Sequence, residues 1–530
     1  MTAGNSNKGG RRRPYPRPID YFILSIAAMS SPLATWANNS VGIGHPERLI
    51  LLGAIPWLIG VGFVHLSMAL GARRVTVVGT VFVATLVFMR GAPLLSALGI
   101  LAGYAVAIVS VSIVGYLISR RKTQGLVQSV LVAVSIALLG GVLGSLYETR
   151  TSMGVDVALS NSGDPDVELH ETPDIFVVLT DGYAGVITLA EDFGIANSPL
   201  SVALRDRGFQ VPKSAWSAYA STEFSFSSLL DMSYPVGPGT GVEPLTKSRM
   251  YEIIGGKNRL VAELQEAGYR VTMIESGSSG TQCGGYIHRC IPSPFLDEAV
   301  FWTVARTLAR PLVLDSRGYA FTVGTQSTMA WLRDNAHDIS TNGTPDLILA
   351  QLMAPHPPLF LNADCDHHYD NELSGLFLVR GGDDVDRRRE AYIEQARCVD
   401  GFLIELADLV DDGAVMVYVA DHGTDSRLQL VTHPADWDTE GVRERLNILM
   451  AVRAGEGCSI GDPVLLPNLM RRVLSCLSQD PVPDLEPRMF KSAVISFDGE
   501  KSPVIEVEDD LVTSLMMAGV DDPTPENESG

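Results

Sequence analysis

Long apolar runs dominate the first 147 residues of the chain, where acidic residues are nearly absent. A helix of about 20 apolar residues crosses a bilayer, so the pattern predicts an N-terminal polytopic α-helical membrane domain at residues 1–147 with about five spans. A cleaved signal peptide is the alternative for the first run, but no convincing small-residue cleavage site follows it. The five runs occupy residues 21–36, 49–70, 75–89, 94–118 and 127–146.

Basic residues indicate the orientation of these spans. They cluster before the first run, between the second and third runs, and after the fourth, at residues 11–13, 73–74 and 120–122. With five spans, this alternation places the N-terminus inside the cell and everything after Leu146 outside the cytoplasm. We therefore expect a multi-pass cell-membrane protein whose C-terminal part is extracytoplasmic.

The pattern changes after the last apolar run. Residues 148–172 are polar and predict a linker. From residue 173, apolar runs of strand length alternate with stretches of helical periodicity, which is typical of a mostly parallel sheet between helices. We expect an α/β domain at 173–500 and a C-terminal extension at 501–530 whose acidic end is disordered. The expected strands are 174–180, 209–211, 270–274, 346–353, 415–420 and 447–452, and the expected helices are 199–207, 257–267, 387–410 and 466–477.

Charge and cysteine content narrow the possible partners and the compartment. The formal net charge of −21 argues against nucleic acid or an anionic membrane surface as a partner. All six cysteines follow the membrane part, where disulfides persist. Cys283 and Cys290 flank a Gly-Gly turn and are the expected pair, while the other pairings stay open. A zinc knuckle is the alternative, but no Cys-x-x-Cys spacing supports it.

Chemically capable residues follow three of the predicted strands. Asp181 ends the first, His356 follows the strand at 346–353, and Asp421 with His422 follows the strand at 415–420. Ligands of open α/β sheets bind beyond the carboxyl ends of the strands. Each residue alone could form a turn, a rigid loop or a cap. Together, however, carboxylates and imidazoles suit a divalent cation, so we expect a metal site.

A candidate nucleophile lies in the segment 219–230, where small polar residues lead into an apolar-periodic stretch, as at the start of a helix. A hydroxyl at a helix N-terminus faces backbone N–H groups and the positive end of the helix dipole, which favours a phosphoryl group. A metal-bound hydroxyl also ionises more easily and becomes a competent nucleophile. The alternative is a Ser/Thr-rich helix cap without chemistry.

Four segments together resemble bacterial sulfatase-like hydrolases and transferases of the alkaline phosphatase superfamily, close in layout to the membrane-anchored lipoteichoic acid synthases, which are phosphoglycerol transferases. The resemblance runs in order from residue 173 to about 452, through segments 173–183, 219–232, 355–358 and 421–423. It implies an alkaline phosphatase-like fold for the α/β domain. It also implies that Thr222 is the nucleophile and a metal ligand, with Asp181, Asp421 and His422 as the other ligands. His356 would contact the substrate phosphate or the leaving group, and His288 and His433 are candidates for further substrate contacts.

The resemblance also implies one or two divalent metal ions. With one imidazole among the ligands, we expect Mn²⁺ ahead of Mg²⁺ or Zn²⁺. The formylglycine motif of true sulfatases, Cys/Ser-x-Pro/Ala-x-Arg, is absent after Thr222, so sulfate-ester hydrolysis is not expected. Lipoteichoic acid synthases usually carry Glu where this chain has Asp181, which leaves the donor open.

The function that follows is a metal-dependent transferase at the outer membrane face. It would move a phosphoryl-linked head group from a membrane lipid donor to a glycan or glycolipid acceptor. One alternative is a phosphodiesterase or phosphatase that uses water as the acceptor, which the sequence does not distinguish. Another is a non-catalytic membrane-anchored protein that binds an envelope component.

Overall fold

The computed structural model describes residues 167–238, 244–277, 281–293, 316–341, 343–357, 359–367, 385–427, 432–478, 481–492 and 504–518. Uninterrupted apolar runs form the centre of a six-stranded sheet, in the order β4-β3-β5-β1-β6-β7. Only the pairing of β6 with β7 is antiparallel. The strands are β1 (Ile175–Asp181), β3 (Arg270–Ile274), β4 (Arg289–Ile291), β5 (Asp346–Pro355), β6 (Val415–Ala420) and β7 (Met450–Arg453).

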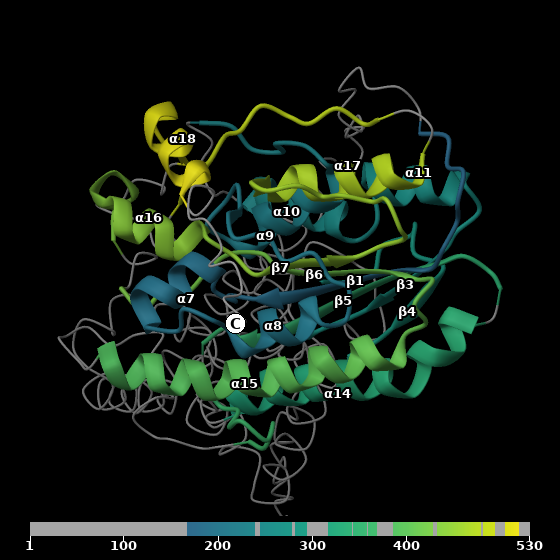
Figure 1. Ribbon diagram of the computed structural model, residues 1–530, viewed down its shortest axis with the longest axis horizontal. Helices are drawn as coiled ribbons and strands as arrows, with labels where there is room; N and C mark the ends of the chain where they lie inside the picture. The colour runs from purple at the N-terminus through teal and green to yellow at the C-terminus, as the bar shows by residue number, and fades with distance from the viewer. Residues whose placement is uncertain are drawn as a thin grey trace, which may run out of the picture. The chain divides into compact units, whose positions relative to one another are not determined.

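Helices cover both faces of this sheet, because strands buried on both faces need apolar partners on each side (Figure 1). One layer holds α8 (Pro199–Arg205), α14 (Ser316–Thr341) and α15 (Val385–Leu409). The other holds α9 (Thr222–Asp231), α10 (Pro244–Ile254), α11 (Arg259–Glu266) and α17 (Leu466–Leu477). The predicted α/β domain with a mostly parallel sheet between helices is confirmed.

Smaller elements extend this domain. β2 (Ala215–Trp216) pairs in parallel with β8 (Val464–Leu465), and β9 (Phe490–Lys491) pairs antiparallel with β10 (Ile505–Glu506). α18 (Asp509–Met517) buries Val512 and Leu515 in a second apolar cluster beside Trp216. Residues 504–518 of the predicted extension are therefore folded against the domain. The remaining elements are α7 (Val186–Phe193), the short 3₁₀ helix η3 (Pro434–Asp436) and α16 (Thr439–Leu446).

Most expected elements agree with the structure within a few residues, and the strands at 270–274 and 415–420 agree at both ends. The strand expected at 209–211 is instead a single bridge between Gln210 and Val452. β7 begins three residues later than expected, because Asn447 and Ile448 form isolated bridges with Trp216 and Ala184. Helix α14 was not foreseen.

All six cysteines form disulfides. The expected pair Cys283–Cys290 is confirmed. The other two pairs, which the sequence left open, are Cys365–Cys398 and Cys458–Cys476. Cys365–Cys398 joins the loop after β5 to helix α15.

Within the described ranges, no helix is long and apolar enough to cross a membrane. The five expected spans and residues 148–166 of the expected linker lie outside the described residues, as does the chain after 518. The last residues of the expected linker contact the domain, since Leu169 bridges Ser478 and the His170 N–H donates to the Leu477 carbonyl.

Candidate active site

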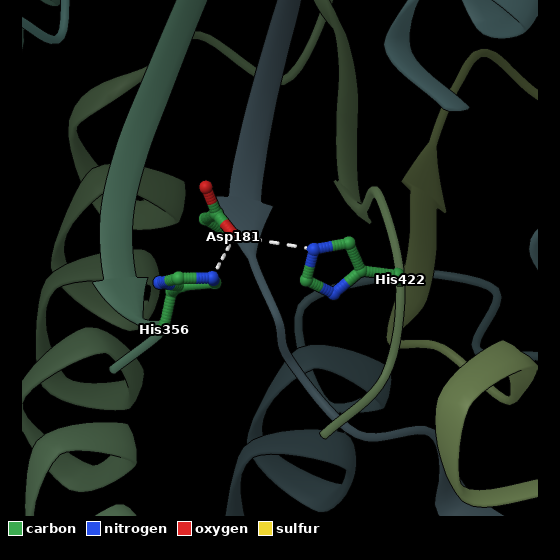
Figure 2. Close-up of side chains that lie close together, drawn as sticks. All are labelled: Asp181, His356 and His422. Atoms are coloured by element: carbon green, nitrogen blue, oxygen red, sulfur yellow. Dashed lines mark ion pairs between the residues drawn. The ribbon is translucent and has the colours of Figure 1, made fainter. Parts of the chain in front are cut away.

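Three adjacent strands end at one edge of the sheet and place their following residues together. β5, β1 and β6 are neighbours and parallel, so their carboxyl ends lie side by side. Figure 2 shows Asp181, at the end of β1, between His356 from the end of β5 and His422 from the end of β6. Asp181 and His356 are 175 positions apart in the sequence, and His356 and His422 are 66 positions apart. The fold brings all three together.

The polar atoms of five side chains converge around His422 Nε2. This nitrogen lies 3.4 Å from Thr222 Oγ1, 3.4 Å from Asp421 Oδ2 and 3.5 Å from Asp181 Oδ1. His356 Nε2 lies 3.9 Å from the same Asp181 oxygen. One ligand atom each from Asp181, His356 and His422 fall within 4.8 Å of one another, so these atoms could share one cation.

Each carboxylate uses one oxygen for the protein and turns the other to the centre. Asp421 Oδ1 accepts the N–H groups of Gly182 at 3.0 Å and His422 at 2.8 Å. Asp421 Oδ2 is buried and accepts no hydrogen bond of normal geometry from the described residues. Asp181 Oδ2 accepts from Gln351 Nε2 at 3.2 Å, while Oδ1 faces the two imidazoles.

Both imidazoles are held as neutral rings with Nε2 directed inward. His422 Nδ1 lies 2.9 Å from the Gly423 carbonyl, and His356 Nδ1 contacts the Pro357 carbonyl. A carbonyl can only accept, so each Nδ1 carries the hydrogen and each Nε2 keeps its lone pair. Burial lowers the pKa of His356 to about 3 and the pKa of His422 well below its ordinary value. Both rings are therefore ready to act as ligands without losing a proton first.

The hydroxyl of Thr222 belongs to the first residue of α9. Ser221, before it, has extended backbone and makes no side-chain cap, so the first N–H groups of the helix are not used by a capping hydroxyl. Ser217 Oγ donates to the Asp421 carbonyl at 2.6 Å and lies 3.0 Å from Ser225 Oγ. The start of α9 is thereby fastened to the end of β6.

Gly423 is required by close packing. A Cβ at this position would lie 2.1 Å from the Glu444 carbonyl oxygen and 2.7 Å from the Asn447 carbonyl oxygen. Because these atoms are backbone, they cannot turn aside as a side chain could. The glycine after His422 thus lets the segment that follows β6 lie directly against the end of α16.

This donor set fits a divalent cation. Two carboxylate oxygens, two lone-pair imidazole nitrogens and one hydroxyl face a common point. One of these oxygens, Asp421 Oδ2, is buried and accepts no hydrogen bond of normal geometry from the described part of the chain. The sequence assigned His356 to the substrate alone, but its nitrogen is also placed to ligate. With two imidazoles, the set suits Zn²⁺ as well as Mn²⁺.

A second cluster of potential ligands, Glu275 with Cys283 and Cys290, does not qualify. The two sulfurs are joined in a disulfide, so neither is a thiolate. Thiolate is the form in which cysteine binds metal.

Two histidines expected to contact substrate lie elsewhere. His288 precedes β4 and accepts the Val271 N–H on Nδ1 at 3.0 Å, at the amino end of the parallel strands and away from Asp181. His433 caps η3, and its Nδ1 accepts the Ala435 N–H at 3.2 Å. The structure brings neither side chain into the cluster around His422.

Two residues near the centre were missed by the sequence interpretation. Gln351 lies inside the apolar run of β5, and its Oε1 accepts from Ser276 Oγ at 3.0 Å while its amide donates to Asp181. Arg445 lies in the last turn of α16 and is 2% exposed. A polar residue within a buried strand was the available signal for Gln351, whereas Arg445 reads like an ordinary basic residue on a surface helix.

Gln351→Met is expected to lower the affinity of the protein for Mn²⁺ or Zn²⁺ by about 10–100-fold, because Asp181 loses the amide that orients it. The measurement is competition with a chromophoric chelator on the metal-free full-length protein. Gln210→Met is the control, since Gln210 likewise uses both ends of its amide, on the Cys458 carbonyl and the Ile460 N–H, but outside the cluster. Equal affinities in the Gln351 and Gln210 variants would contradict the orienting role.

Comparisons with known proteins give structural similarities only. No protein-family model and no curated protein sequence matches the chain. The C-terminal periplasmic domain of EcEptC from Escherichia coli, in complex with Zn, is similar at 13% identity with a TM-score of 0.39, covering 64% of this chain and 96% of that one. The soluble domain of lipooligosaccharide phosphoethanolamine transferase A from Neisseria meningitidis is similar at 14% identity with a TM-score of 0.37, covering 59% of this chain and 92% of that one.

A phosphonate monoester hydrolase from Silicibacter pomeroyi is similar at 14% identity with a TM-score of 0.40, covering 62% of this chain and 81% of that one. The similar structures also include a putative sulfatase from Bacteroides fragilis and a protein in the alkaline phosphatase superfamily from Vibrio parahaemolyticus. Similarity at this level does not establish an activity, and the chemistry rests on the residues of the site.

Proposed function

We propose that this protein is a metal-dependent phosphotransferase that acts at the outer face of the membrane. It moves a phosphoryl-linked head group from a membrane lipid donor to a hydroxyl of a glycan or glycolipid. One observation carries the proposal: the Thr222 hydroxyl, at the N-terminus of α9, lies 3.4 Å from His422 Nε2 beside two inward-facing carboxylate oxygens. The alternative, in which Thr222 only caps the helix, does not account for the carboxylates and imidazole that surround its hydroxyl.

Thr222 is the nucleophile in this proposal. Its oxygen attacks the phosphorus of the lipid phosphodiester, the bond from phosphorus to the diacylglycerol oxygen breaks, and a phosphothreonine that retains the head group forms. An acceptor hydroxyl then attacks the same phosphorus and releases Thr222 with its proton restored. A bound divalent cation would supply positive charge that favours the ionised hydroxyl and offsets charge on the phosphoryl oxygens.

His356 moves the proton. Its neutral ring presents the Nε2 lone pair toward the centre, because Nδ1–H is engaged by the Pro357 carbonyl. When Asp181, Thr222, Asp421 and His422 hold the cation, the lone pair on His356 Nε2 is left to take the proton of the attacking hydroxyl and return it to the departing diacylglycerol oxygen. Gln395 fixes the backbone of His356 by donating to its carbonyl at 3.0 Å. The first N–H groups of α9 face the phosphoryl oxygens and favour their negative charge.

The extracytoplasmic location agrees with the three disulfides of the domain, since such bonds persist outside the cytoplasm. The membrane domain expected at residues 1–147 would keep the site close to lipid head groups and raise the effective concentration of the donor.

The test uses the full-length protein in vesicles that contain phosphatidylethanolamine or phosphatidylglycerol labelled in the head group. We expect metal-dependent release of diacylglycerol and transfer of the label to an added glycolipid. Label released as a free phosphorylated head group, with none on the acceptor, would replace the transferase by a phosphodiesterase. Absence of divalent cation from the purified protein, with no turnover after its addition, would refute both enzymes and favour a binding protein.

A further inference from the structure

Arg445 is a buried cation beside the site, and its side-chain hydrogen bonds within the described part of the chain all go to main-chain carbonyls. Nε and Nη2 donate to the Ala220 carbonyl at 2.9 and 2.7 Å, and Nη1 donates to the Gly423 carbonyl at 3.1 Å. Burying a guanidinium away from water costs several kcal/mol unless nearby groups compensate. A helix that needed only to pack would be served as well by a long apolar side chain.

The two carbonyls belong to the two segments that carry the chemistry. Ala220 lies two residues before Thr222, and Gly423 follows His422 directly. The guanidinium therefore spans the gap between the nucleophile segment and the ligand segment with three donors in one plane.

Gly423 is also held on its other side. Its N–H donates to the backbone carbonyl of Arg445 at 2.7 Å, so both polar groups of this glycine are engaged by the same residue. The Gly423 carbonyl accepts a second hydrogen bond from His422 Nδ1 at 2.9 Å. A displacement of Arg445 would thus move the acceptor that sets the tautomer and the direction of the His422 ring.

The charge of Arg445 favours the same arrangement. It is offset by the carboxylates of Asp425, Asp421 and Asp181, and the last two belong to the proposed ligand set.

We propose that Arg445 is a positioning residue that holds Thr222 and His422 in register by bridging the Ala220 and Gly423 carbonyls. This inference rests on the proposed function. It extends that function by assigning the relative placement of nucleophile and ligand to a residue that touches neither the substrate nor the metal.

The test compares Arg445→Lys with Arg471→Lys in the full-length protein. Lysine keeps the charge but cannot place three planar donors on two carbonyls. Arg471 is the matched control because it is also fully buried and donates to two carbonyls, of Met232 and Pro483, distant in sequence from each other. The readouts are affinity for Mn²⁺ and Zn²⁺, kcat and KM on the labelled phospholipid, and the thermal unfolding midpoint.

For Arg445→Lys we expect metal affinity and kcat to fall by about 10–100-fold, with KM nearly unchanged because the substrate does not contact Arg445. Arg471→Lys should lower the unfolding midpoint at least as much but leave metal affinity and kcat per folded molecule unchanged. Wild-type affinity and kcat in Arg445→Lys, or equal losses in both variants, would overturn the inference. If Arg445→Lys does not fold, Arg445→Gln is measured in the same way and judged by the same outcomes.

The metal readout separates this inference from the proposed function. If wild type binds the cation but turns over no phospholipid, the transferase proposal fails, while the contrast in metal affinity between Arg445→Lys and Arg471→Lys still decides the role of Arg445.

Discussion

Thr222→Ala is expected to reduce turnover of a labelled phospholipid by roughly 10³-fold or more, since Thr222 supplies the hydroxyl that lies 3.4 Å from His422 Nε2. The label should also disappear from the protein itself. In wild type, brief incubation followed by acid quench should trap the labelled head group on Thr222, and peptide mass spectrometry would locate it.

Thr222→Ser and Ser228→Ala are the controls. The first keeps a hydroxyl at the start of α9 and should retain measurable turnover. The second removes a buried hydroxyl of the same helix that donates to the Ser225 carbonyl at 2.8 Å, and it should leave turnover unchanged. Wild-type turnover in Thr222→Ala would refute the nucleophile assignment.

Asp421→Asn is expected to have opposite effects on metal binding and on stability. The amide oxygen can still accept the N–H groups of Gly182 and His422, so the local backbone is preserved. The amide nitrogen, however, would face the centre and has no lone pair to offer. Affinity for Mn²⁺ or Zn²⁺ should fall by more than about 100-fold, beyond the effect of changing an outer partner such as Gln351.

The metal-free Asn variant should nevertheless be more stable than metal-free wild type. Burial raises the pKa of Asp421, which means that the folded state disfavours its charge. Removing that charge should raise the free energy of unfolding by about 1–2 kcal/mol. Chemical denaturation in the presence of a chelator measures it.

Asp231→Asn is the control for the Asp421 variant. Asp231 is also buried, and it accepts from the Arg259 N–H and from Ser233 Oγ, at the far end of α9 from Thr222. This variant should leave metal affinity unchanged and should not gain stability. An Asp421→Asn protein that binds metal as wild type does would exclude Asp421 as a ligand.

The strands and the residues at their ends could be predicted because their signals are local. A run such as Val415–Ala420 is apolar throughout, since both of its faces are buried, and its boundary with Asp421 is visible in the sequence alone. Parallel pairing then brings Asp181, His356 and His422 to one edge without further information.

The supporting residues could not be predicted because their roles depend on partners far away in the chain. Gln351 acts on Asp181 across 170 positions, and Arg445 acts on Ala220 across 225. His288 failed to reach the cluster for a related reason: it stands before β4, not after it, and only the direction of that strand places it at the opposite edge. The sequence shows that a histidine adjoins a strand, but it does not show at which end of the sheet that histidine lies.

The order of strands in the sheet has a consequence for biosynthesis. β1 lies between β5 and β6, yet it precedes them in the chain by 172 and 240 residues, as the pairs Ile175–Leu347 and Ile175–Val415 show. At a synthesis rate of about 5–20 residues per second, its second neighbour emerges roughly 10–50 seconds later. The edge of β1 that pairs with β5 stays open until residue 355 is made, and the edge that pairs with β6 stays open until residue 420 is made. The central pairing of the sheet therefore forms only after residue 420 has been synthesised.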